Sequence, residues 1–193
     1  MKYVFALTFL YIVSVLQGCV NQKFYNHRDY SFYSPMQVNP SKIALRTDGV
    51  YILDEIITDS KEEQSKTASV THIFKFYDGG QVNKVLSQKR SLTADECVEV
   101  FNDRIAKRLK TSTPTLFEGY YRQRNDSIVV QQMSTPTRQF YYTYGYVNNG
   151  ALIIVSQTHV TSGEFAAKYY NNNYKAVYRF IYTGKSRYLA PDW

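Results

Sequence analysis

The chain has 193 residues, with 23 Lys and Arg against 16 Asp and Glu, and a formal net charge of +7 at pH 7. Its 9 Gly and 5 Pro argue against a collagen-like or largely disordered chain, and its 2 Cys exclude a disulfide-rich scaffold and a cysteine zinc site. One domain is the expectation at this length, and it is long enough to bury a hydrophobic core.

The first 18 residues have the features of a secretory signal peptide. An apolar run covers residues 3–15 after the basic start at Lys2. The run suits a signal-peptide core and is shorter than the roughly 20 residues of a membrane-spanning helix. It ends in LQGC at residues 16–19, which resembles a bacterial lipobox. This resemblance implies that residues 1–18 are removed and that Cys19 is lipidated; the alternative is an ordinary cysteine after an uncleaved signal anchor.

The residues after Cys19 predict where the mature protein lies. Val20, rather than Asp, follows the cysteine, and by resemblance to the enterobacterial sorting rule this favours the outer membrane. The acidic cluster that Bacteroidetes surface lipoproteins often carry is missing here, which favours the periplasmic side. Residues 19–41 are polar, with scattered aromatic residues and no periodicity, and predict a lipidated tether. An alternative is that the aromatic residues of this tether dock on the domain.

Residues 42–193 predict one β-rich domain. Turn signals such as Asp78-Gly79-Gly80 and the asparagines and glycine of 148–150 separate its extended segments. The predicted strands lie at residues 43–46, 50–57, 70–77, 81–87, 116–124, 127–133, 138–147, 151–160 and 174–182. The first two of these segments can form a single bent strand, so the count is about eight.

Residues 93–110 predict the one clear helix. Thr93 and Glu96 form a capping-box pattern at its start. Apolar residues then recur every four positions and form one stripe, which comprises Cys97, Phe101, Ile105 and Leu109. We expect this stripe to pack against the domain, which would bury Cys97, the only thiol that remains in the lipidated chain.

The order of these elements predicts a closed barrel. Neighbouring strands are linked as antiparallel pairs, and only one helix interrupts them, so no crossover helices are available for a parallel sheet. Closure also removes exposed strand edges. We therefore predict a mainly β fold, an up-and-down antiparallel barrel of about eight strands with one inserted α-helix; the alternative is an open sheet covered by the helix.

Several stretches resemble small lipocalin-like lipoproteins of Bacteroidetes. Besides the lipobox, they are LRTDGVYI at residues 45–52, FKFYDGGQV at 74–82, EGYYRQRNDSIVV at 118–130 and YVNNGALIIV at 146–155. The resemblance covers most of residues 43–182 and implies a lipid-anchored, lipocalin-like barrel. Its motifs are mainly turns, so they bear on fold more than on activity.

Motifs for catalysis or metal binding are missing from the sequence. His27, His72 and His159 lie far apart, and no histidine pair has the spacing of a zinc site. The chain has no GxSxG motif, no glycine-rich phosphate loop and no cysteine beside a plausible base. A site formed by His72 and His159 on adjacent strands is possible, but polar residues on the surface or lining a pocket are the favoured interpretation. We expect neither an enzyme nor a metal or cofactor.

The charge is unevenly distributed along the chain. Residues 104–193 carry 12 basic and 4 acidic residues, whereas residues 19–103 carry 10 basic and 12 acidic ones. A basic half can meet anionic lipid, glycan or another polyanion. The favoured interpretation is a solvated basic face, and nucleic acid is not an expected partner in this compartment.

Two aromatic rows give the strongest indication of a ligand. Alternation puts Phe140, Tyr142, Tyr144 and Tyr146 on one face of a strand, and Tyr174, Tyr178, Phe180 and Tyr182 on one face of another. Tyrosines have an apolar ring and a polar hydroxyl, so such rows can line a barrel mouth. The candidate ligand-binding residues are Tyr142, Tyr144, Tyr178 and Phe180, although aromatic rows of this kind more often simply fill a small barrel.

These patterns predict a lipid-anchored envelope protein whose barrel binds a small or amphiphilic ligand without catalysis. The alternative function is a non-enzymatic interaction subunit of an envelope protein complex.

Overall fold

The computed structural model describes residues 27–33, 44–58, 70–89, 91–111, 117–134 and 139–193. The predicted signal peptide, residues 1–18, and Cys19 lie outside these ranges. The strands are β1 (Gly49–Ile57), β2 (Thr71–Phe76), β3 (Gln81–Ser87), β4 (Glu118–Arg124), β5 (Ser127–Ser134), β6 (Gln139–Asn148), β7 (Ala151–Thr158) and β8 (Lys175–Tyr182). The helices are α2 (Ala94–Thr111) and the short 3-10 helices η1 (His27–Asp29), η2 (Ala167–Tyr169) and η3 (Lys185–Arg187).

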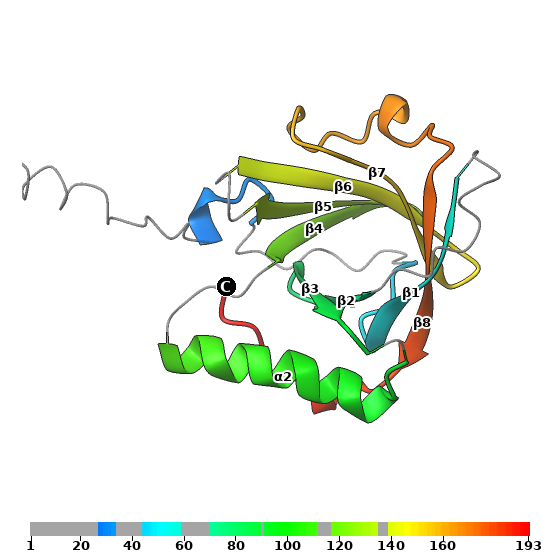
Figure 1. Ribbon diagram of the computed structural model, residues 1–193. Helices are drawn as coiled ribbons and strands as arrows, with labels where there is room; N and C mark the ends of the chain where they lie inside the picture. The colour runs from blue at the N-terminus through cyan, green and yellow to red at the C-terminus, as the bar shows by residue number, and fades with distance from the viewer. Residues whose placement is uncertain (1–26, 34–43, 59–69, 90, 112–116, 135–138) are drawn as a thin grey trace, which may run out of the picture.

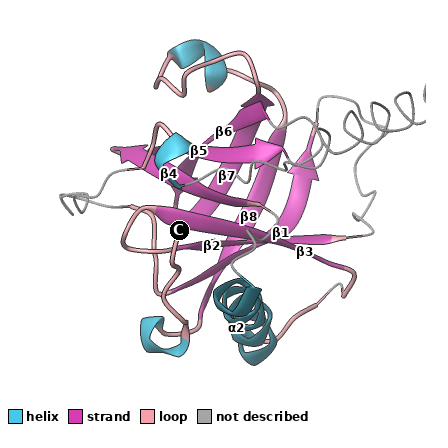
Figure 2. Cartoon of the chain, turned by 90° about the vertical axis from the view of Figure 1, so that its left-hand side faces the viewer, coloured by secondary structure: helices cyan, strands magenta, loops and turns pink. Residues whose placement is uncertain are grey.

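The eight strands form a closed antiparallel barrel in chain order (Figures 1 and 2). Each strand pairs with the next, and β8 returns to pair with β1. The prediction of a mainly β, eight-stranded up-and-down barrel with one inserted helix is therefore confirmed, and the open sheet is not what the chain forms. Residues 44–48, where the first extended segment was expected, enter the barrel as a loop before β1.

The barrel interior contains one hydrophobic core. Alternation along each strand sends every second side chain inward, and on β2 the inward face carries Phe74 and Phe76. The fully or nearly buried members of this core are Leu45, Tyr51, Phe74, Phe76, Val82, Tyr121, Ile128, Val130, Val147, Leu152, Ile154, Ala176 and Tyr178.

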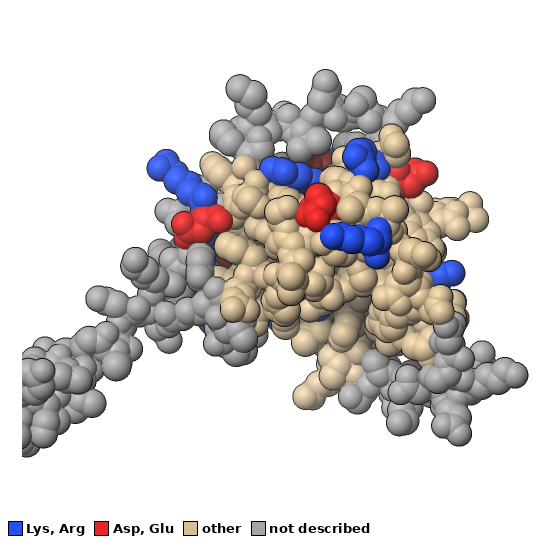
Figure 3. Space-filling model, turned by 90° about the horizontal axis from the view of Figure 1, so that it is seen from above, with Lys and Arg blue, Asp and Glu red and all other residues tan. Residues whose placement is uncertain are grey.

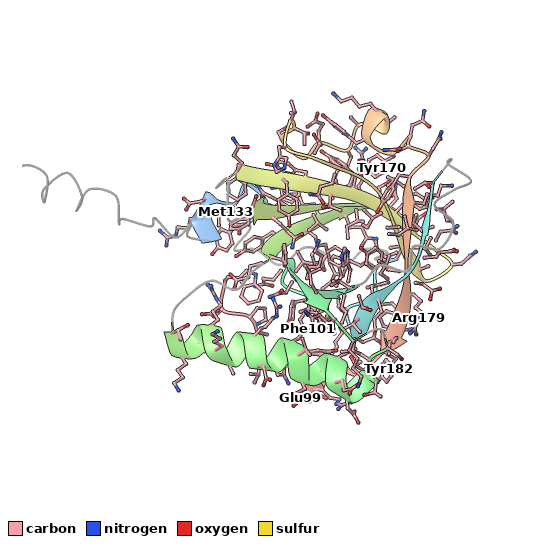
Figure 4. The ribbon with its side chains drawn as sticks, in the orientation of Figure 1. Glu99, Phe101, Met133, Tyr170, Arg179 and Tyr182 are labelled. Carbon is pink, nitrogen blue, oxygen red and sulfur yellow. The ribbon has the colours of Figure 1, made fainter. Side chains whose placement is uncertain are left out.

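Helix α2 covers the outer face of β1, β2 and β3 and lies beneath the barrel in Figure 1. Its predicted capping box is present: the backbone N–H of Thr93 donates to Glu96 Oε2 at 2.8 Å, and the N–H of Glu96 donates to Thr93 Oγ1 at 3.3 Å. Figure 4 shows Phe101 pointing from the helix toward the strands and Glu99 pointing away. No helix of the described part of the chain is long and apolar enough to cross a membrane.

The apolar stripe of α2 ends one turn earlier than predicted. Cys97, Phe101 and Ile105 are fully buried, as expected, but Leu109 is 54% exposed. Burial also raises the pKa of the Cys97 thiol to about 11, with a smaller contribution from Glu96. Leu109 therefore does not belong to the packed stripe.

The outer face of β4 to β7 is covered by segments of the chain that are not strands. Residues 27–33, the loop after β7 and the C-terminal Trp193 form a second aromatic cluster over it. Tyr30 and Phe32 are buried there, and Arg122 Nη2 donates to the carbonyl of Ser31 at 2.7 Å. The described part of the predicted tether is therefore docked on the domain.

Substitutions at a buried and at an exposed position of the helix stripe test where the packed part of the stripe ends. We expect Phe101→Ala to lower the free energy of unfolding by about 3–5 kcal/mol, because it leaves a cavity under the helix. The matched control, Leu109→Ala in the same stripe, should change it by less than about 0.5 kcal/mol because the side chain is exposed. Urea unfolding of both variants measures the difference; similar losses would show that Leu109 also packs against the domain.

Candidate functional site

The four candidate ligand residues lie on opposite sides of the barrel wall. Tyr178 and Phe180 face the interior, where Tyr178 belongs to the core and Phe180 packs against it. Tyr142 and Tyr144 face outward and belong to the aromatic cluster that covers β4 to β7. The structure therefore brings together the two residues of each strand but does not place all four around one space.

Tyr142 and Tyr144 are covered by other segments of the chain itself. The Phe32 ring packs edge-on against Tyr142 at 5.7 Å between centroids, and the Tyr144 ring stacks on Tyr169 at 4.5 Å. The Tyr142 hydroxyl accepts a hydrogen bond from Gln131 Nε2 at 3.0 Å. Tyr142 and Tyr144 therefore fill a packed aromatic cluster and do not line a ligand pocket inside the barrel.

Phe180 lies at the end of the barrel that is filled by aromatic rings. Its ring is 5.1 Å from that of Tyr51, and the Arg46 guanidinium lies 4.1 Å from its centroid. The backbone N–H of Arg46 donates to the Tyr51 hydroxyl at 2.9 Å, and the neighbouring Leu45 is buried in the same core. We call this the closed end, because the loop before β1 crosses it.

Tyr178 lies nearer the opposite end, where β2 and β8 begin and β3 ends. Its ring packs edge-on against Phe74 at 5.2 Å. Lys84, which pairs with Phe74 across β2 and β3, places its ammonium 5.7 Å from the Phe74 ring and 4.9 Å from the Phe117 ring. At this end no described loop residue joins the interior core, so we call it the open end. Its inward-facing residues form the mouth cluster, which comprises His72, Phe74, Lys84, Phe117, Gln132, Tyr141 and Tyr178.

Hydrogen bonds hold the neutral side of the mouth cluster in place. The Tyr141 hydroxyl donates to Gln132 Oε1 at 3.2 Å, and Gln132 Nε2 donates to the carbonyl of Phe117 at 2.5 Å. Phe117 has a φ of 63°, a left-handed conformation that is costly for a bulky residue and persists only where surrounding contacts enforce it. The amide of Gln132 thus fixes Phe117 beside Lys84.

Burial governs the titration of the mouth cluster. It lowers the pKa of Lys84 below the usual lysine value. The pKa of His72 is lowered by burial and, to a smaller extent, by the Lys84 charge, so His72 is neutral at pH 7. Burial raises the pKa of Tyr178 and of Tyr141. Within the mouth cluster, the group that carries charge at neutral pH is therefore Lys84.

Lys84 also lies just beyond the paired part of β3 and β4. Among the described residues these strands pair from Gln81 to Asn83, and beyond that one backbone hydrogen bond, from Lys84 N–H to the Phe117 carbonyl at 3.3 Å, joins them. The rim of the same end carries exposed apolar side chains, namely Ile56, Ile57, Leu86 and Tyr174. In the described residues, the open end thus combines exposed apolar side chains at its rim, aromatic walls and the inward-facing ammonium of Lys84.

Sequence reasoning noted His72 and Tyr178 but missed Lys84, Phe117, Gln132 and Tyr141. Alternation along β3 was the available signal, because it puts Lys84 on the same face as Val82, which is buried in the core. The pairing of Tyr141 with Gln132 across β5 and β6 depends on strand register, which the sequence alone does not supply.

A second feature is a cleft of about 290 Å³ outside the barrel, between the β2–β3 turn and the C-terminal segment. Lys75 lines it and is only 2% exposed. Its ammonium donates to the Thr47 carbonyl at 2.5 Å and the Phe76 carbonyl at 3.1 Å, and lies 4.3 Å from the Tyr188 ring centroid. These contacts make Lys75 a support that ties the C-terminal segment to the barrel.

Carboxylates and carbonyls engage much of the basic half of the sequence. Arg179, Lys185 and Arg187 pair with Asp54, Asp78 and Asp95, respectively. Arg108 pairs with Glu118 at 2.9 Å. On the face shown in Figure 3, basic and acidic side chains are interspersed. Because these basic side chains form ion pairs within the fold, the pairings favour a solvated basic surface over a single anion-binding face.

The histidines do not assemble a metal centre in the part of the chain that the structure describes. No group of three or more His, Cys, Asp or Glu residues within these ranges could hold a metal ion. His159 instead packs edge-on against Tyr141 at 5.8 Å.

Comparisons with protein-family models, with curated proteins and with solved structures find no match for this chain. The resemblance to lipocalin-like lipoproteins therefore remains a prediction, and the site has to be interpreted from its own geometry.

The buried ammonium of Lys75 predicts a pH dependence of stability. Burial lowers the pKa of Lys75 to about 8, although Asp78 and Asp48 act in the opposite direction. Between pH 8 and pH 10 the unfolded chain binds this proton more tightly than the folded one, so the free energy of unfolding should rise with pH, by about 2 kcal/mol from this group. Above pH 10 buried tyrosines such as Tyr188, whose pKa burial raises to about 12, reverse the trend.

Urea unfolding of the wild type and of Lys75→Met at pH 8, 9 and 10 measures this contribution. The variant keeps an apolar stem of similar length but has no ammonium, so its curve should rise less than that of the wild type. Parallel curves across this range would contradict the assignment.

Proposed function

We propose that this chain is a lipid-anchored lipoprotein of the outer membrane, facing the periplasm, whose barrel binds a small amphiphilic ligand at its open end without catalysis. The observation that supports this most strongly is the uneven interior. Aromatic rings and Leu45 fill the closed end, whereas the mouth cluster contains polar groups, aromatic walls and an ammonium. A barrel of eight strands has room for at most one small ligand beside its own side chains.

The arrangement suits a molecule with an apolar chain and a polar head. The apolar rim, with Ile56 and Leu86 exposed, meets the chain of such a ligand, and each methylene buried contributes about 0.8 kcal/mol. Tyr178 and Phe74 provide aromatic surface just inside the rim. A purely structural barrel has no need for exposed apolar residues at this place, and large exposed apolar groups mark binding sites when they gather.

The anchor part of the proposal rests on the lipobox at residues 16–19 and on the docking of Tyr30 and Phe32. Ten residues separate Cys19 from Tyr30, and the chain between these two residues spans at most about 40 Å. A lipid on Cys19 would therefore hold the barrel close to the membrane surface. Acyl chains at this position give stable anchoring when two or more insert.

Filling the interior near Tyr178 tests the binding proposal. Leu53 pairs with Tyr178 across β1 and β8 and packs against the core, so Leu53→Trp should occupy the space below the open end. We expect it to weaken binding of the neutral fluorescent probe N-phenyl-1-naphthylamine at least tenfold. Val177→Trp, beside Tyr178 but on the outer face of β8, is the matched control and should bind like the wild type.

Thermal unfolding of both variants establishes that each is folded. Equal binding by Leu53→Trp and the control would contradict an interior site. Failure of the wild type to bind the probe would contradict the proposed function and favour the alternative, an interaction subunit of an envelope complex.

Substitution of Cys19 tests the anchor. Full-length wild type expressed in a bacterial host should incorporate labelled palmitate and lack residues 1–18 by intact mass, because acylation precedes cleavage in lipobox proteins. Cys19→Ser should do neither, whereas Cys97→Ser, at the fully buried helix cysteine, should be processed normally. Normal cleavage of Cys19→Ser would refute the lipobox assignment.

A further inference from the structure

We infer that Lys84 selects ligands with an anionic head group, such as a carboxylate, sulfonate or phosphate, at the open end of the barrel. This inference rests on the proposed function and specifies its ligand class. Three observations support it: the Lys84 ammonium faces the barrel interior, its neighbours are aromatic rings, and these rings carry no negative charge that could neutralise it.

The Lys84 side chain points into the barrel rather than into solvent. It lies on the face of β3 that also carries Val82, which is buried in the interior core, and its cross-strand partner is Phe74. The two groups recorded beside its ammonium are aromatic rings, Phe74 at 5.7 Å and Phe117 at 4.9 Å. Aromatic faces attract a cation but do not neutralise its charge.

Other lysines of the barrel contrast with Lys84. Lys75 donates to two backbone carbonyls, Lys89 is paired with Glu96, and Lys185 is paired with Asp78 at 2.9 Å. Within the described residues, no ion pair involves Lys84, and burial is the one recorded cause of its lowered pKa. The barrel therefore removes water from the Lys84 ammonium, and no described carboxylate compensates for that loss with an ion pair.

A desolvated cation costs free energy until an anion or a hydrogen-bond acceptor reaches it. An anionic head group supplies both, and it does so where solvent is partly excluded, so the interaction is stronger than at an exposed lysine. The neutral alcohol of the same chain length offers an acceptor but no charge. A cationic head group would be repelled.

The other polar residues of the mouth cluster carry no positive charge, so Lys84 is the residue of this cluster that can pair with an anionic head group. The Gln132 amide accepts a hydrogen bond from Tyr141 and donates one to the Phe117 carbonyl, and these two bonds position Phe117 beside Lys84. His72 is held neutral by burial and by Lys84. Among the described residues, Lys84 lies just beyond the paired part of β3 and β4, toward the end of the barrel at which we place the head group.

Displacement of bound N-phenyl-1-naphthylamine by three ligands of equal chain length tests the inference at pH 7. These are decanesulfonate, which stays ionised at all relevant pH values, decanol, and decyltrimethylammonium. The wild type should bind decanesulfonate at least tenfold more tightly than decanol, and decyltrimethylammonium more weakly than either.

Variants of Lys84 separate its charge from its packing. Lys84→Met keeps most of the apolar stem and should bring the decanesulfonate affinity down to that of decanol, with the decanol affinity unchanged. Lys84→Arg keeps the charge and should retain the preference for the sulfonate. Lys89→Met, at an exposed lysine after the same strand, is the control and should behave as the wild type.

Each outcome bears on a different claim. An unchanged sulfonate-to-decanol ratio in Lys84→Met, or equal losses for both ligands, would overturn the inference while leaving an interior ligand site in place. A wild type that binds neither the naphthylamine nor any of the three ligands would overturn the proposed function and the inference together.

Discussion

The pairing of β1 with β8 is the constraint on which the rest of the structure depends. Eight residue pairs join these strands and convert a meander into a closed barrel. The pairing places Tyr51 opposite Phe180 and Leu53 opposite Tyr178, and so determines which aromatic row enters the interior. Glycine is required at the start of β1, because a Cβ on Gly49 would lie 2.4 Å from the Phe180 ring. Closure thus fills one end of the barrel with rings and leaves the polar groups of the strands at the other.

Closure also leaves an apolar outer wall, and this explains the limits of prediction from sequence. Strand positions, the helix and its cap follow from local patterns, and α2 begins and ends within one residue of the predicted span 93–110. The inward direction of a row does not follow from alternation when both faces of a strand are apolar. Tyr142 and Tyr144 are buried on the outer face only because residues 27–33 and the loop after β7 cover them, and contacts between such distant segments leave no local signal.

Buried cations were the other feature that the sequence did not reveal. A lysine within a strand normally indicates the solvent face, yet Lys75 is buried under the C-terminal segment and Lys84 faces the interior. The two differ in what surrounds them. Carbonyls and the Tyr188 ring satisfy Lys75 within the fold, which makes it a structural group. Among the described residues, the Lys84 ammonium lies beside the Phe74 and Phe117 rings and forms no ion pair. This difference leads from a general prediction of an amphiphile-binding barrel to a specific one about its ligand.

Tyrosine ring resonances measured during a titration with decanesulfonate would test this account most directly. The inward rings Tyr141 and Tyr178 and the outward rings Tyr142 and Tyr144 can be assigned by single Tyr→Phe variants. The account predicts saturable shifts at Tyr178 and Tyr141 with no comparable change at Tyr142 and Tyr144. Shifts confined to Tyr142 and Tyr144, or no saturable shift at any of the four rings, would contradict an interior site at the open end of the barrel.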